Sequence, residues 1–149
     1  MTVRLTRDTV DLAIVTNDLA RMARFYIGVL GFTDGGTAPT RSTRGGRVHR
    51  LRCGTTGVKL VRYDPPVPAQ LTGGDVHAAT GFRYCTLHVA NLDDIVGACE
   101  RAGAIVVTPV KEVSPGVRIA IVEDPDGNWI EFLGDDRAIE QSERDEVPS

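Results

Sequence analysis

The sequence predicts an α+β domain of two tandem βαβββ modules, which form a curved, cup-shaped mixed sheet with the helices outside. Each half begins with a strand-like segment, continues with an amphipathic helix that a glycine ends, and finishes with further strands. The two glycines, Gly31 and Gly103, lie 72 residues apart, and the first strands are offset by 73. A unit found only twice points away from a solenoid, which needs three or more repeats.

The first module is expected over residues 9–63. Its helix is predicted by apolar residues that recur in steps of three and four after a polar capping cluster. A tight turn that begins at Gly54 joins its last two strands. The expected elements are a strand over 10–15, a helix over 18–30, a short strand at 32–33, a loop to residue 46, and strands over 47–53 and 57–63.

The second module is expected over residues 82–134, after a connector over 64–81 that is rich in proline and glycine. A turn at 124–127 has proline and glycine where a hairpin turn favours them. The expected elements are a strand over 82–89, a helix that begins after Asn91 and ends at Gly103, and strands over 104–110, 117–122 and 128–133. The charged tail, 135–149, is expected to be solvated or frayed.

Composition and charge exclude several classes of function. The chain is 42% hydrophobic and 25% charged, as is ordinary for a globular domain. The tail holds six acidic residues and two arginines, which leaves 14 acidic and 15 basic residues elsewhere, from totals of 20 and 17. A nearly neutral body argues against nucleic-acid binding, which needs a dense basic face.

Two further features of the sequence indicate where in the cell the protein is expected and whether its cysteines are reduced. The N-terminus lacks the apolar stretch of a secretory signal, and the chain has no apolar run of the about 18 residues that would cross a membrane. We therefore expect a cytoplasmic protein. Its three cysteines, Cys53, Cys85 and Cys99, are odd in number and far apart, so we expect small buried hydrophobic residues rather than disulfides.

Two segments carry a resemblance to a known family. The stretches DLARMARFYIGVLGF (18–32) and EDPDGNWIEF (123–132) resemble the two signatures of the vicinal oxygen chelate superfamily. It includes glyoxalase I, bleomycin-resistance proteins, methylmalonyl-CoA epimerase, fosfomycin-resistance enzymes and extradiol dioxygenases. The resemblance covers about residues 10–133 and implies the fold and a homodimer, but not one function, because one scaffold hosts many chemistries.

The resemblance also implies where a site lies. Enzymes of this superfamily hold a divalent metal with four side chains, whose positions fall on Asp11, Lys59, Tyr84 and Glu131. Histidine is usual at the first-strand positions and glutamate at the last-strand positions, so only Glu131 matches. Because an ammonium group repels a metal ion, we expect no metal. Lys59 would replace its charge in a buried cluster between Asp11 and Glu131.

Other residues are candidates for ligand binding. Trp129 shares a strand face with Glu131, whereas Ile130 and Phe132 face the other way and can pack on a helix. His88 is expected at the edge of the site, and His49 on a neighbouring strand within reach of a ligand. A cluster of arginines over 41–52 suggests contacts with an anionic substrate. The ligand-binding candidates are Trp129, His49, His88 and Arg50.

Three hypotheses about function follow. The first is a metal-independent lyase or isomerase that transfers a proton on a small oxygenated metabolite, with Glu131 as acid or base and Lys59 and Tyr84 polarising an oxygen. Asp11 would be a second acid-base group or would orient Lys59. The second is a metal-free protein that sequesters a drug or natural product, as bleomycin-resistance proteins do. The third is an enzyme that binds a metal through Glu131, Asp11 and a histidine.

Overall fold

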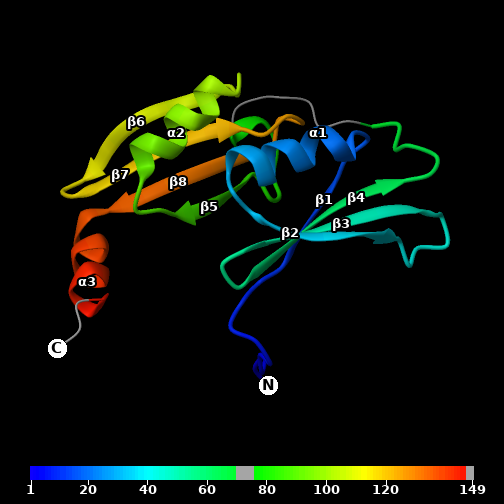
Figure 1. The fold of residues 1–149 in the computed structure, drawn as a ribbon, viewed down its shortest axis with the longest axis horizontal. Coiled ribbons are helices and arrows are strands. Elements are labelled where there is room, and N and C mark those ends of the chain that lie inside the picture. The colour runs from blue at the N-terminus through cyan, green and yellow to red at the C-terminus, as the bar shows by residue number, and fades with distance from the viewer. Residues whose placement is uncertain (70–75, 147–149) are drawn as a thin grey trace. The chain divides into compact units, whose positions relative to one another are not determined.

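A computed structural model describes residues 1–69 and 76–146 and divides the chain into two compact units, Met1–Gln70 and Leu71–Ser149. Each unit contains one four-stranded mixed sheet with a helix packed on one face (Figure 1). The predicted α+β fold of two βαβββ modules is therefore confirmed.

The first unit has the strand order β1-β4-β3-β2. Strand β1 is parallel to β4, and the other neighbours are antiparallel. Cys53 pairs with Thr56, so Gly54 and Thr55 form the tight turn between β3 and β4. The elements are β1 (Leu12–Val15), α1 (Leu19–Ala23), η1 (Arg24–Val29), β2 (Thr33–Pro39), β3 (Gly46–Cys53) and β4 (Thr56–Tyr63).

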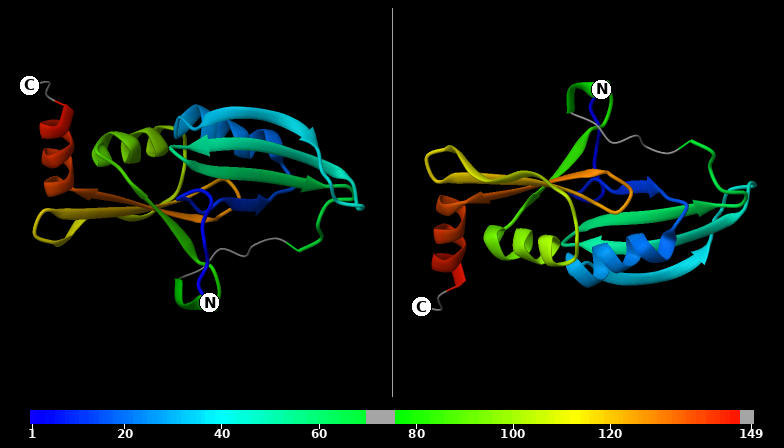
Figure 2. Two further views of the ribbon diagram at one scale, coloured as in Figure 1. Left: turned by 90° about the horizontal axis from the view of Figure 1, so that it is seen from below. Right: turned by 90° about the horizontal axis from the view of Figure 1, so that it is seen from above.

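The second unit repeats this topology with the order β5-β8-β7-β6, in which β5 is parallel to β8. Figure 2 shows α2 lying along its sheet, as α1 lies along the sheet of the first unit. The elements are η2 (Val76–Ala78), β5 (Tyr84–His88), α2 (Leu92–Arg101), β6 (Val106–Ser114), β7 (Val117–Glu123), β8 (Trp129–Asp135) and α3 (Asp136–Glu146).

Two predictions about local structure were wrong. Strand β2 runs from Thr33 to Pro39, where we expected two strand residues and a loop. The pairing with β3 shifts register between Asp34 and Thr37, and Gly36 has a φ of 80°. A bulge of this kind lets the strand continue without the regular alternation that a sequence pattern needs.

The tail is the second correction, because residues 136–146 form the helix α3 rather than a frayed end. Asp136 lies in its first turn and Arg144 in its last, which suits the helix dipole. Glu140 and Arg144 are 3.8 Å apart at a spacing of four residues. No residue of this helix is buried, so the expectation of a solvated segment holds.

The helix of the first unit packs through an apolar stripe. Met22, Phe25 and Tyr26 are buried, as are Leu60 and Val58 of β4, the strand that α1 contacts. The helix widens after Ala23, since the backbone N–H of Leu30 donates to the carbonyl of Phe25, five residues earlier, at 3.1 Å. Gly31 then ends the helix with a φ of 75°, as the sequence predicts.

In the second unit the alternation of β8 sorts its side chains between two faces. Ile130 and Phe132 are each 1% exposed and lie with Val122 beneath α2. Trp129 and Glu131 are half-buried on the opposite face, as predicted. Trp129 and Glu131 are therefore more exposed than Ile130 and Phe132, because successive side chains of a strand point to opposite faces of the sheet.

The expectation of buried cysteines holds for Cys99, which is fully buried, whereas Cys53 and Cys85 are half-buried. Burial, together with the nearby Glu100 carboxylate, raises the pKa of the Cys99 thiol to about 11. At neutral pH this residue is a thiol that packs as a small apolar side chain. Over the described part of the chain, no helix is both long and apolar enough to cross a membrane.

The turn between β7 and β8 is organised by one buried carboxylate. Asp124 is 4% exposed and accepts hydrogen bonds from the backbone N–H groups of Asp126 and Asn128, each at 2.9 Å, and from Asn128 Nδ2 at 2.8 Å. The Asp124 backbone also exchanges hydrogen bonds with Asn128 and Gly127. This network fixes the start of β8 and therefore the positions of Trp129 and Glu131.

Replacing Asp124 by Ala should lower the free energy of unfolding by about 2 kcal/mol, because it leaves buried N–H donors without an acceptor. The midpoint of urea unfolding measures this loss. Asp126→Ala is the matched control, since Asp126 contributes its backbone N–H rather than its carboxylate. Equal destabilisation by the two substitutions would contradict the role given to Asp124.

Candidate functional site

Each sheet has one face covered by its helix and one face turned away from it, which we call the open face. On the open face of the first unit, Lys59 is the centre of a row across three strands. It pairs with Ala13 of β1 on one side and with Arg50 of β3 on the other. Residues paired in this way point to the same face, so Lys59 and Arg50 are adjacent cations.

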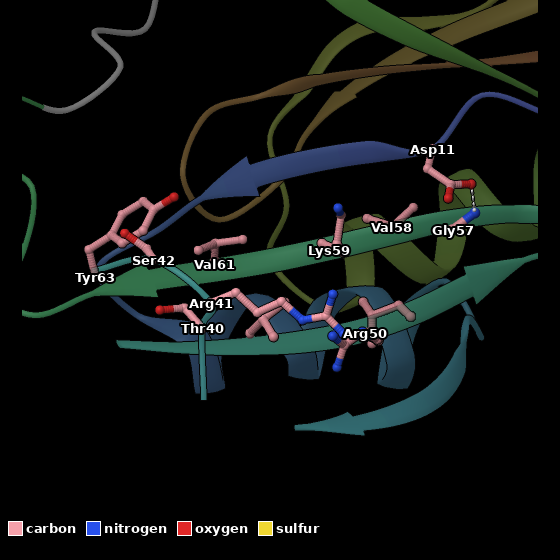
Figure 3. A pocket seen from close by; sticks show the side chains of 12 residues that line it. Asp11, Thr40, Arg41, Ser42, Arg50, Gly57, Val58, Lys59, Val61 and Tyr63 are labelled. Atoms are coloured by element: carbon pink, nitrogen blue, oxygen red, sulfur yellow. Dashed lines mark hydrogen bonds between the residues drawn. The ribbon is translucent and has the colours of Figure 1, made fainter. Parts of the chain in front are cut away.

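A hollow of about 490 Å³ lies on this face of the first unit (Figure 3). Its wall is formed by β3, by β4 and by the turn that joins β2 to β3. A concave surface with several polar groups is the usual form of a small-molecule site. Its polar side chains include Asp11, Thr40, Arg41, Arg50, Lys59 and Tyr63.

Asp11 lines the hollow but does not form the expected buried ion pair with Lys59. The backbone N–H of Gly57 donates to Asp11 Oδ1 at 2.9 Å, and Arg7 donates to Oδ2 at 2.9 Å. Both Asp11 and Lys59 are exposed, and Lys59 has no ion pair among residues 1–69 and 76–146. The prediction that Asp11 and Lys59 form a buried ion pair was therefore wrong, because Arg7 of the N-terminal segment is the cation that pairs with Asp11. The convergence of all four positions stays a prediction.

The surroundings of Asp11 lower the pKa of its carboxyl below the usual value. The Gly57 hydrogen bond is the largest cause, desolvation is the next and opposes it, and the hydrogen bond and charge of Arg7 and then the charge of Lys59 lower the pKa further. Asp11 therefore stays a carboxylate through the neutral range, with its oxygens directed to Gly57 and Arg7. This arrangement favours the orienting role over that of a proton donor.

In the second unit Glu131 has the same place in its sheet as Lys59 has in the first. It pairs with Thr86 of β5 and with Ile121 of β7. Thr86 Oγ1 donates to Glu131 Oε1 at 2.8 Å, and both side chains are half-buried. Thr86 therefore holds the carboxylate in one orientation and leaves Oε2 with no protein donor among the described residues.

Sequence reasoning missed Thr86 because the family pattern points to Tyr84, two residues earlier. Tyr84 pairs instead with Trp129 and is 50% exposed. Trp129 Nε1 donates to Glu123 Oε1 at 3.2 Å, so the indole is tied to β7. Thr86 is identified by the register of the parallel strands β5 and β8, which places it beside Glu131. A sequence motif does not contain that register.

The two histidine candidates lie away from these rows. His88 is exposed and pairs with Leu133, two residues beyond Glu131, and its position at the edge of a site stays a prediction. His49 pairs with Leu60, so it lies on the helix-covered face of β3 rather than the open face. Its Nε2 is 2.7 Å from Asp34 Oδ1. The expectation that His49 reaches a ligand on the open face is therefore corrected, because alternation turns its side chain away.

Comparisons with known proteins agree with this geometry. Residues 9–132 match the model of the Glyoxalase/Bleomycin resistance protein/Dioxygenase superfamily. The chain belongs to this superfamily. A search of curated proteins gave no significant match.

Solved structures of superfamily proteins share the fold at low identity. A glyoxalase family protein from Bacillus cereus is 19% identical, with a TM-score of 0.78 over 89% of this chain and 95% of that one. The trypanothione-dependent glyoxalase I of Leishmania major is 22% identical, with a TM-score of 0.64 over 94% and 95%. A glyoxalase/bleomycin resistance protein from Streptomyces sp. CB03234 is 22% identical, with a TM-score of 0.58 over 85% and 98%.

The side chains at the superfamily's metal positions do not fit a divalent metal. Lys59 is a cation beside a second cation, Arg50, and the Asp11 carboxylate is already directed to Gly57 and Arg7. Tyr84 offers a phenol where an imidazole is usual. Within the described residues, no three His, Cys, Asp or Glu side chains are grouped so that they could hold a metal ion. A cationic site suits an anion instead.

The lowered pKa of Asp11 predicts a pH effect with a definite sign. Because the folded-state pKa lies below the unfolded value, Asp11 stabilises the fold above that unfolded value, and this contribution is lost as the pH falls through the folded-state pKa. An NMR titration of the Asp11 carboxyl carbon measures the shift. Arg7→Gln should leave part of the lowering in place, because the Gly57 hydrogen bond is its largest cause. A return to the ordinary value in this variant would contradict the assignment.

Proposed function

We propose that this superfamily member binds a small oxygenated anion on the open face of the first unit, without a divalent metal. Lys59 and Arg50 supply the positive charge, and the hollow beside them supplies the space. The observation that carries this proposal is the direct pairing of two cations across β3 and β4. Like charges placed opposite each other destabilise a sheet, and a bound anion turns that repulsion into attraction.

Other arginines of the two sheets support this reading by contrast. Arg62 is 3.2 Å from Asp64, and Arg118 is 3.0 Å from Asp93. Neither Arg50 nor Lys59 has such a carboxylate among the residues that the structure describes. Arg50 and Lys59 differ from these two arginines, since they line the hollow with no acidic partner within the described residues.

Replacing Lys59 by Met should weaken binding of a simple probe anion, benzenesulfonate, by roughly tenfold, since one charge-assisted contact is lost. Chemical-shift changes of backbone amides during a benzenesulfonate titration give the dissociation constant. Lys111→Met is the matched control, because Lys111 is an exposed strand lysine of the second unit. Absence of saturable binding, or equal losses in both variants, would contradict the proposal.

Proton transfer by Glu131 is the second candidate function, and the Thr86 hydrogen bond favours it. A carboxylate with one oxygen held and the other unengaged by the described residues is arranged to take a proton from a carbon acid. The same group can return the proton to a neighbouring atom, which is the chemistry of a lyase or isomerase. A protein that only sequesters its ligand needs no such base.

Proton transfer and sequestration are separated by hydrogen exchange. In deuterated water, a panel of 2-oxo and 2-hydroxy acids should lose an α-hydrogen signal in NMR spectra when the protein is present. Glu131→Gln should abolish this exchange, and Thr86→Val should slow it by about tenfold because the carboxylate is no longer oriented. Glu112→Gln, on the exposed strand β6, should exchange at the normal rate. Binding of these acids without exchange would favour sequestration.

A further inference from the structure

The turn between β2 and β3, residues 40–45, brings a third cation to the hollow. The backbone N–H of Thr40 donates to the carbonyl of Gly46 at 3.0 Å, and that of Gly45 donates to the carbonyl of Ser42 at 3.1 Å. The turn is therefore closed by its own hydrogen bonds. Arg41 extends from it into the wall that Arg50 and Lys59 also line (Figure 3).

Arg44 attaches this turn to the end of β4. Its guanidinium lies 5.9 Å from the centre of the Tyr63 ring, and its Nη2 donates to the carbonyl of Pro65 at 3.3 Å. The backbone N–H of Asp64 also donates to the carbonyl of Gly45 at 3.4 Å. Tyr63 itself lines the hollow. Arg44 thus holds the turn in place while Arg41, three residues earlier, faces the hollow.

The charges that line the hollow are unbalanced. Arg41, Arg50 and Lys59 are cations without an ion pair among the described residues, and Asp11 is the one carboxylate in the wall. Asp11 does not balance them, because Arg7 already pairs with it. A second feature points to a missing partner, since Thr40 Oγ1 is a buried hydroxyl of the wall that has no hydrogen-bond partner in the described structure.

From these observations we infer that the hollow selects a doubly charged oxyanion group, such as a phosphate monoester, and that Arg41 makes the selection. Arg50 and Lys59 hold one negative charge, as in the proposed function on which this inference rests. The Arg41 guanidinium meets the second charge, with a planar set of donors that matches phosphate oxygens. Arg44 is a positioning residue, since it acts on the ligand only through the turn that carries Arg41.

Two probes of similar shape test this selection. Benzenesulfonate carries one negative charge, and phenyl phosphate carries two at about pH 8. The unaltered protein should bind phenyl phosphate at least about tenfold more tightly at the same ionic strength. Calorimetric titration of each probe into the full chain gives both dissociation constants.

Substitutions in the turn then test which of its residues cause the preference for the doubly charged probe. Arg41→Gln should lose about tenfold in affinity for phenyl phosphate and less than about twofold for benzenesulfonate. Arg44→Gln should reproduce this selective loss, whereas Arg44→Lys should recover only part of the affinity, because lysine lacks the planar stacking of arginine on Tyr63. Arg47→Gln is the matched control, because Arg47 lies on the opposite face of β3 and donates to Thr37.

The outcomes separate this inference from the proposed function. Binding of both probes with equal affinity, or an equal loss for both in Arg41→Gln, would overturn the selection by Arg41 and leave the Arg50 and Lys59 site in place. Failure of both probes to bind the unaltered protein would overturn both the inference and the proposed function. A charge-selective loss in Arg41→Gln with an unchanged Arg47→Gln would support the inference.

Discussion

The pairing of Lys59 with Arg50 is the constraint on which the account depends. The register of β3 and β4 places two cations next to each other on the face turned away from α1. Two like charges at such a position work against the sheet, and this is why we propose that an anion binds there. Membership of the superfamily does not by itself explain this feature.

The internal repeat makes the difference between the two units informative. Lys59 and Glu131 occupy the same place in their sheets, but their neighbours differ. Lys59 lies between a small apolar residue and Arg50, whereas Glu131 lies between an apolar residue and Thr86. The first arrangement gathers positive charge and the second orients one carboxylate. We therefore propose anion binding for the first unit and proton transfer for the second, and the two proposals are distinct.

Sequence reasoning reached the fold because the pattern of the repeat is local. The apolar helix stripes, the glycine stops and the alternation around Glu131 depend on neighbouring residues, and the structure confirms each of them. The DPDGN stretch was read as a turn, but the buried Asp124 carboxylate that organises it could not be seen without the folded backbone. Strand β2 escaped prediction because a glycine bulge interrupts its alternation.

The details of the site depend on strand register, and no local pattern contains it. Thr86 and the Arg7 pair with Asp11 were missed because each contact joins a predicted residue to a segment whose alignment the sequence leaves open. His49 was expected within reach of a ligand, and its true face was not evident because Val48 and Leu51, buried three residues apart, obscure the alternation of β3. Asp11 and Lys59, chosen from family positions, line the hollow of the first unit, but the sequence did not reveal the groups that orient Asp11.

The chain contains two lysines, Lys59 and Lys111, which allows the central claim to be tested at one atom. Protein labelled with ¹⁵N only at lysine side chains gives two ammonium signals, which can be followed by NMR as phenyl phosphate is added. The account predicts that the Lys59 Nζ signal shifts and saturates while the Lys111 signal stays in place. Equal, unsaturable shifts of both signals would mean that Lys59 is an ordinary solvated lysine, and would contradict it.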